Sequence, residues 1–179
     1  MPFSMGVKNC LLASRLNPLS PPSLSRKPIP RCSGSSSTSP RLIGCLEIQS
    51  IIQNSGVIAC LRASSAELAY EAASVALTSG ISALEITMAT PGVFEVLDQL
   101  VWEHPNSALG VGTVLCIEDA RRAIKIGAKF LMSPATVEGI LDECKDSDVL
   151  YIPGAMTPTE ILSVHQAGAN LVKCLHWEG

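Results

Sequence analysis

The chain has 179 residues, of which 47% are hydrophobic and 16% are charged, and its formal net charge is −3. Residues 46–179 hold seven basic and sixteen acidic residues, a formal charge of −9, which argues against nucleic acid or an anionic membrane surface as partner. No apolar stretch reaches the ~18 residues that a membrane span needs. The length fits one domain with an appendage.

Residues 1–45 differ in composition from the rest of the chain. They hold six basic residues, ten serines and seven of the twelve prolines, but no acidic residue. A basic, serine-rich start without an apolar core segment is typical of an organelle transit peptide. We therefore predict a disordered transit peptide over 1–45, directed to the plastid (chloroplast), with the mitochondrion as second choice, and a folded domain over 46–179. A disordered tail without a targeting role is the alternative.

From residue 56, short apolar runs alternate with helix-like segments, after a leading helix near 45–53. The predicted strands are 56–62, 82–87, 108–114, 129–133, 149–153 and 170–174. Nearly continuous apolar runs indicate parallel strands covered on both faces, and a repeat of about 23 residues favours a compact (β/α)8 barrel. The predicted fold is an α/β TIM barrel, incomplete here, with about six strands and five to six helices. A doubly wound sheet is the alternative, although no G-x-G-x-x-G follows the first run.

The helix-like segments have recognisable ends. Ser64 and Thr157 each precede a glutamate by three residues, which predicts two capping boxes. The remaining predicted N-caps are Thr90 and Thr136, and the predicted helix stops are Gly80, Gly127 and Gly168.

Polar side chains lie inside or just after the apolar runs, where a barrel carries its chemistry. Alternation places Ala83, Glu85 and Thr87 on one strand face, which we assign to the barrel interior. Lys173 ends the apolar run "NLV". Burying either charge alone is costly. Two interpretations follow: a structural Glu85–Lys173 ion pair, or a catalytic pair in which a desolvated amine attacks a ketone while the carboxylate moves protons.

The folded part has four cysteines and no C-x-x-C spacing, so no metal or redox site is predicted. We interpret these cysteines as small apolar fillers. They are Cys60, Cys116, Cys144 and Cys174.

Several stretches, taken in order and spacing, match one known family. They are "GVIACLR" (56–62), "LEITMATP" (84–91), "GVGTVL" (110–115), "FLMSP" (130–134), "YIPGAMTPTE" (151–160) and "LVK" (171–173). Together they resemble the bacterial 2-keto-3-deoxy-6-phosphogluconate / 4-hydroxy-2-oxoglutarate (KDPG/KHG) aldolases over about residues 46–173. That is roughly the first six of the eight βα units of a barrel.

The resemblance implies class I aldolase chemistry without a metal or other cofactor. Lys173 matches the family's Schiff-base lysine, and Glu85 matches its acid/base carboxylate. The substrate would be a 2-oxo acid, cleaved to pyruvate and a small aldehyde such as glyceraldehyde 3-phosphate or glyoxylate. The matched positions that would bind substrate are Arg62, Thr113, Pro134 and Pro153.

The chain departs from the family pattern in two places. The family usually reads "EITLRTP", but Met88-Ala89 stand here in place of Leu-Arg, and that arginine grips the substrate carboxylate. After Lys173, "CLHWEG" replaces an aromatic-Pro pair, and the last two strands of the barrel are absent. We expect a C-terminally shortened product of a longer, plant plastid-type aldolase gene, whose open sheet edges favour pairing with another chain.

Three functions therefore stay open. The first is an aldolase, supported by Lys173 with Glu85. The second is a non-catalytic subunit that assembles with a full-length sibling, since family members are usually homotrimers. The third is a different small barrel enzyme that binds phosphate.

Overall fold

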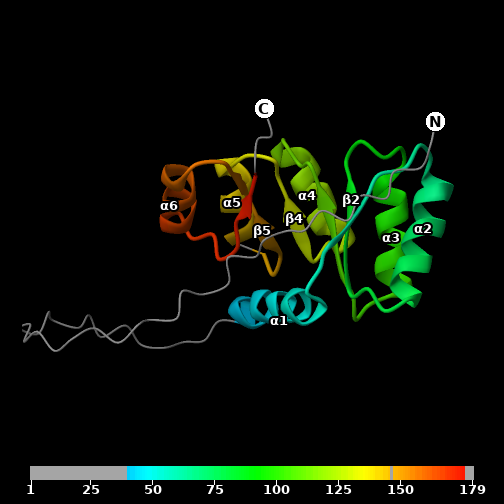
Figure 1. Ribbon diagram of the computed structural model, residues 1–179. Coiled ribbons are helices and arrows are strands. Elements are labelled where there is room, and N and C mark those ends of the chain that lie inside the picture. The colour runs from blue at the N-terminus through cyan, green and yellow to red at the C-terminus, as the bar shows by residue number, and fades with distance from the viewer. Residues whose placement is uncertain (1–39, 146, 176–179) are drawn as a thin grey trace, which may run out of the picture.

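The computed structural model describes residues 40–145 and 147–175, in which helices and strands alternate (Figure 1). The helices are α1 Pro40–Ser55, α2 Ala66–Thr78, α3 Val93–Glu103, α4 Ile117–Ile126, α5 Glu138–Lys145 and α6 Pro158–Gln166. The strands are β1 Ala59–Leu61, β2 Ala83–Thr87, β3 Ala108–Gly112, β4 Phe130–Met132, β5 Leu150–Ile152, β6 Gly154–Ala155 and β7 Lys173–Cys174.

Helix α1 begins at Pro40 and spans the boundary predicted between residues 45 and 46. The leading helix predicted near 45–53 is confirmed, although it starts earlier. The predicted transit peptide falls mainly on residues 1–39, which lie outside the described residues, as does the end of the "CLHWEG" segment.

Strands β1 to β5 form one parallel sheet in which each strand lies beside its neighbour in the sequence. A doubly wound sheet reverses its strand order at a switch point, whereas a barrel adds strands in chain order. The order β1-β2-β3-β4-β5 is therefore that of a barrel. The sixth predicted strand pairs only at its end, where β7 joins the short β6 in a second, two-stranded parallel sheet.

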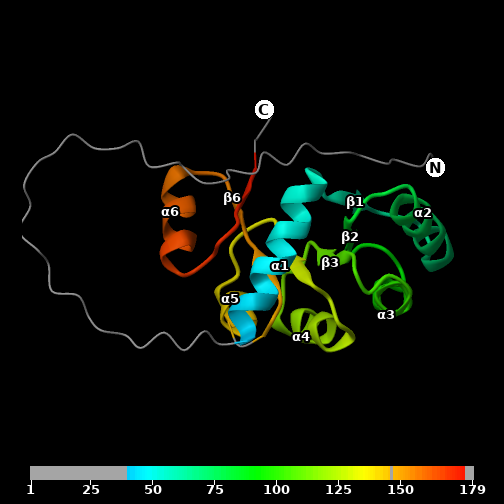
Figure 2. The same ribbon diagram turned by 90° about the horizontal axis from the view of Figure 1, so that it is seen from below.

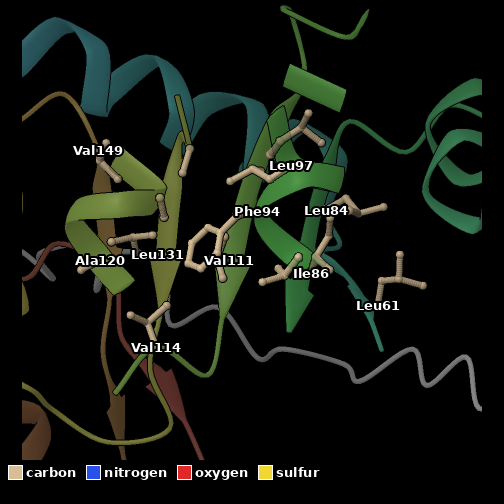
Figure 3. Close-up of a cluster of buried hydrophobic side chains, with 14 of the residues drawn as sticks. Leu61, Leu84, Ile86, Phe94, Leu97, Val111, Val114, Ala120, Leu131 and Val149 are labelled. Atoms are coloured by element: carbon tan, nitrogen blue, oxygen red, sulfur yellow. The ribbon is translucent and has the colours of Figure 1, made fainter. Parts of the chain in front are cut away.

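The outer apolar cluster lies between the sheet and helices α2 to α5. Alternate strand residues such as Leu84, Ile86 and Val111 belong to it, together with Phe94 and Leu97 of α3 (Figure 3). Side chains alternate between the faces of a strand, so the residues between these positions face the other side of the sheet. Burial of this apolar surface holds the helices on one face of the sheet.

The inner apolar cluster lies on the opposite sheet face, which corresponds to the interior of a barrel. Phe130 and Leu150 belong to it, and Ile48 and Ile52 of α1 pack against the strand starts there. Helix α1 accordingly lies across the amino ends of the strands, on the other side from α2 to α4 (Figure 2). The carboxyl ends of the strands lie at the opposite edge of the sheet.

The predicted helix starts are correct at one position and wrong at three. Thr157 and Glu160 form the capping box at α6 as predicted. At α2 the N-cap is Ser65 rather than Ser64, because the Ser65 hydroxyl accepts the hydrogen bond from the Leu68 N–H.

The two remaining threonines bond to other loops and do not cap helices. The Thr90 hydroxyl accepts from the Ala63 N–H at 3.3 Å, and Gly92 is the N-cap of α3. The Thr136 hydroxyl donates to the Gly154 carbonyl at 3.3 Å, and α5 starts two residues later. The predicted stops Gly80, Gly127 and Gly168 all have positive φ, as glycine allows. Within the described ranges, no helix has both the length and the apolar character to cross a membrane.

Candidate functional site

The loops at the carboxyl ends of the strands are tied to one another by hydrogen bonds. The Met88 N–H donates to the Gly112 carbonyl, and the Val114 N–H donates to the Met132 carbonyl. The Ser133 hydroxyl donates to the Val114 carbonyl at 2.6 Å. Since each loop is fixed to the next strand, this edge is a rigid platform for side chains.

Glu85 lies in the middle of β2 and faces the sheet interior, as predicted. Glu85 is 3% exposed, and its Oε2 atom has no hydrogen-bond partner among the described residues. Gly112 of β3 makes room for the carboxylate, because a Cβ at that position would collide with Oε2. A buried polar atom without a partner costs free energy, so we take Glu85 as a candidate site residue.

Thr87 shares the face of β2 with Glu85 and is also 3% exposed. Its hydroxyl likewise has no hydrogen-bond partner within residues 40–145 and 147–175. The period-two pattern in the sequence placed both residues on one face, but it did not reveal that neither side chain would find a partner.

Lys173 begins β7 and is half-buried. Leu171 packs against the inner cluster and Val172 against the outer one, so alternation places Lys173 on the interior side. Its N–H donates to the Pro153 carbonyl at 2.8 Å, and it pairs in register with Gly154. Lys173 therefore stands in the second sheet, just beyond the carboxyl end of β5, and faces the same interior side as Glu85.

The other predicted site residues follow four different strands at this same edge. Arg62 and Pro134 are exposed just beyond β1 and β4, and Pro153 is buried between β5 and β6. Thr113 is exposed after β3 and has φ = +63°. A β-branched residue with positive φ is strained by about 1–3 kcal/mol. After this strained turn, the next residue, Val114, buries its side chain, and its backbone N–H donates a hydrogen bond to the Met132 carbonyl of β4.

Glu85 and Lys173 form no ion pair within the described part of the chain. The structural ion pair considered from the sequence is therefore not supported. Both side chains face the interior side; Lys173 is half-buried and Glu85 is buried.

A cavity of about 430 Å³ lies elsewhere, near the amino ends of the strands. Cys45, Gln49, Cys144 and Asn170 are among its lining residues. It lies between β5 and residues 168–170, which precede β7 and do not pair with β5. Because barrel chemistry occurs at the carboxyl ends of the strands, we do not assign the reaction to this cavity. Among the described residues, no cluster of His, Cys, Asp or Glu could hold a metal ion.

The strand order, the outer helices and the polar residues at one strand edge are those of part of a (β/α) barrel. The family model "KDPG and KHG aldolase" matches residues 48–178. The chain belongs to this aldolase family.

Relatives and solved structures agree with the assignment. The 2-dehydro-3-deoxy-phosphogluconate aldolase of Treponema pallidum (strain Nichols) is 34% identical over 97 residues, which are 54% of this chain and 46% of the relative. The KHG/KDPG aldolase of Escherichia coli (strain K12) is 26% identical over 114 residues, 64% of this chain and 54% of the relative.

The 2-keto-3-deoxy-6-phosphogluconate aldolase of Zymomonas mobilis ZM4 has a similar fold, with a TM-score of 0.62 and 23% identity over 69% of this chain and 58% of that one. The chain spans about half the length of the curated relatives it matches.

Proposed function

We propose that this chain performs class I aldolase chemistry on a 2-oxo acid, with Lys173 as the Schiff-base lysine and Glu85 as the group that moves protons. One observation carries the proposal. Lys173 of β7 is half-buried, Glu85 of β2 is buried with its Oε2 atom unpartnered among the described residues, and both face the interior side, in a chain that belongs to the KDPG/KHG aldolase family.

The reaction would begin when the neutral amine of Lys173 attacks the ketone carbon of the substrate. Only the neutral form of the amine has the lone pair that this attack needs. Loss of water gives an iminium, which draws electrons from the neighbouring carbon–carbon bond. Glu85 takes the proton from the substrate hydroxyl, and the bond then breaks to release an aldehyde and leave an enamine. Protonation and hydrolysis of the enamine give pyruvate.

The exposed rim offers groups to bind the substrate. Arg62 is exposed next to the end of β1 and would hold an anionic group. The strained turn fixes Thr113 beside Gly112, which the Glu85 carboxylate touches. Pro134 and Pro153 would shape the loops around the pyruvyl group. Ala89, also exposed, cannot replace the arginine of the family pattern, so Arg62 would carry more of the carboxylate binding.

Substrate cleavage tests the function directly. The full chain would be incubated with 2-keto-3-deoxy-6-phosphogluconate or 4-hydroxy-2-oxoglutarate, and pyruvate release would be followed through lactate dehydrogenase. Release that disappears in Lys173→Ala is the expected result. If neither substrate is cleaved and the folded chain is found only with a longer aldolase, the non-catalytic subunit becomes the better account.

We also propose that the protein acts in the plastid as a homo-oligomer or with a full-length sibling. The basic, acid-free composition of residues 1–45 supports plastid targeting. Strand β1, which among the described strands pairs with β2 alone, supports assembly through its open edge. Import of a fluorescent fusion into isolated chloroplasts tests the first point. Light scattering after gel filtration tests the second.

A further inference from the structure

Two buried polar atoms on the interior face of β2 lack hydrogen-bond partners in the part of the chain that the structure describes, and the proposed reaction uses only one of them. They are the Oε2 atom of Glu85 and the hydroxyl oxygen of Thr87. Among the described side chains, one other buried atom shares this property, the hydroxyl of Ser74 in α2. Burying a threonine hydroxyl without a partner costs free energy. Its position next to the carboxylate suggests that both groups bind the same ligand atom.

The strand register places the carboxylate and this hydroxyl at the same height. Glu85 pairs with Gly110 of β3, whereas Thr87 pairs with Gly112, two residues nearer the carboxyl edge. The Glu85 carboxylate nevertheless reaches Gly112, because a Cβ at Gly112 would collide with its Oε2 atom. The side chain of Glu85 thus extends along the strand to the level of Thr87. The surrounding inner cluster, including Phe130 and Met132, is apolar.

We propose that Thr87 and Glu85 together bind the single oxygen atom that the ketone loses when the Schiff base forms. This inference rests on the proposed function. One oxygen held by both side chains would satisfy two buried polar atoms at once. The Thr87 hydroxyl donates to the ketone oxygen from one side, and the Glu85 carboxyl donates from the other.

The proton balance gives each group a defined task. The amine of Lys173 forms a bond to the ketone carbon, and one amine proton moves to the oxygen, which yields a carbinolamine. The nitrogen lone pair then forms the C=N bond while the C–O bond breaks. The leaving hydroxyl takes a proton from the Glu85 carboxyl and departs as water, leaving a carboxylate and an iminium. The Thr87 hydroxyl keeps its proton throughout and orients the departing oxygen.

The test measures how fast the Schiff base forms and, separately, how much of it forms. The full chain would be mixed with pyruvate and quenched with borohydride at increasing times, and the reduced adduct on Lys173 would be quantified by mass spectrometry. Thr87→Val removes the hydroxyl at nearly constant volume, and Thr87→Ser keeps it. Ser74→Ala is the matched control, because it removes the other unpartnered hydroxyl on the far side of the sheet.

We expect Thr87→Val to slow adduct formation about tenfold, the effect of losing one hydrogen bond in the transition state, while the final amount of adduct and the melting temperature do not fall. Thr87→Ser should restore most of the rate, and Ser74→Ala should match the wild type. A Thr87→Val rate equal to the wild type overturns the inference but leaves the proposed function intact. A lower final amount with no rescue by serine means that Thr87 is structural, which also overturns it. If the wild type forms no adduct, both proposals fail.

Discussion

The Glu85 carboxylate lies against Gly112 of the neighbouring strand, in the space that any larger residue would fill with its Cβ. The carboxylate can therefore stay inside the sheet only because this strand position lacks a side chain. This contact brings together two motifs that are separate in the sequence, "LEIT" and "GVGT". The glycine therefore helps to determine the position of the carboxylate in the candidate site.

Gly112→Ala should displace the carboxylate and slow formation of the pyruvate adduct on Lys173 by at least about tenfold. Overpacking of a buried site should also lower the free energy of unfolding by roughly 1–3 kcal/mol. Timed borohydride quenching and urea denaturation measure the two effects. Gly139→Ala in α5 is a suitable control, because it also overpacks a close contact, against Cδ1 and Cγ1 of Ile117, but does not touch Glu85. An unchanged adduct rate in Gly112→Ala would show that the position of the carboxylate is unimportant.

Glu85→Gln should separate the charge of this residue from its volume. The amide keeps the shape, so we expect a folded protein with a melting temperature equal to or above that of the wild type, because an unpartnered buried carboxyl is costly. Loss of the proton-moving group should slow exchange of the pyruvate methyl protons with D2O by about 100-fold or more. Proton NMR of pyruvate measures this exchange. Equal exchange rates in the two proteins would remove Glu85 from the mechanism.

Ala89→Arg should strengthen binding of the 2-oxo acid. Ala89 is exposed at the carboxyl edge, where the family pattern has an arginine, so a long cationic side chain can be accommodated. A charge-assisted hydrogen bond to the substrate carboxylate should lower the half-saturating pyruvate concentration by about tenfold. Ala89→Met adds similar length without charge and should leave that concentration unchanged. An equal decrease of the half-saturating pyruvate concentration in both variants would show that packing of the longer side chain, and not its charge, strengthens binding.

The buried thiol of Cys144 should resist alkylation. Burial raises its pKa to about 12, so very little thiolate exists at pH 8 in the folded state. Cys174, which is exposed, should react with iodoacetamide far sooner. Since the folded-state pKa lies above the unfolded value, stability should fall as the pH rises between about 9 and 12. Peptide mapping after timed labelling gives the order of modification, and early labelling of Cys144 would contradict the structure.

The capping box at α6 should give a pH-dependent contribution to stability. Hydrogen bonds from the Met156 and Thr157 N–H groups lower the pKa of the Glu160 carboxyl. Because this pKa is depressed in the folded state, the contribution is present above the unfolded value of about 4.5 and is lost as the pH falls through the folded value. Glu160→Gln should therefore lower the melting temperature at pH 7 and have little effect near pH 3. An equal decrease in melting temperature at both pH values would contradict a stabilising role of the ionised Glu160 in the capping box.

Much of this architecture follows from local patterns in the sequence. Each of the six apolar runs contains a strand, and the glycines after the helices stand where the backbone turns left-handed. The interior position of Glu85 follows from alternation with Leu84 and Ile86. These features depend on neighbouring residues alone, which is why the sequence predicts them.

Features set by contacts between distant segments were not predicted. Thr90 and Thr136 look like N-caps, yet their hydroxyls bond to other loops, and only tertiary packing decides between those partners. The fit of Glu85 against Gly112 depends on strand register, which the sequence does not state. Whether β5 pairs with the segment before β7 likewise depends on tertiary packing, and in the structure the two are not paired.

The central claim is that Lys173 forms a Schiff base with a 2-oxo acid. The most direct measurement is to incubate the full chain with pyruvate, reduce it with borohydride, and locate the added mass by intact-protein and peptide mass spectrometry. The account predicts one reduced pyruvate adduct, on Lys173, that is missing in Lys173→Ala and persists in a control variant at an exposed lysine, Lys129→Ala. A folded chain without an adduct, or with adducts spread over its surface lysines, would contradict the claim.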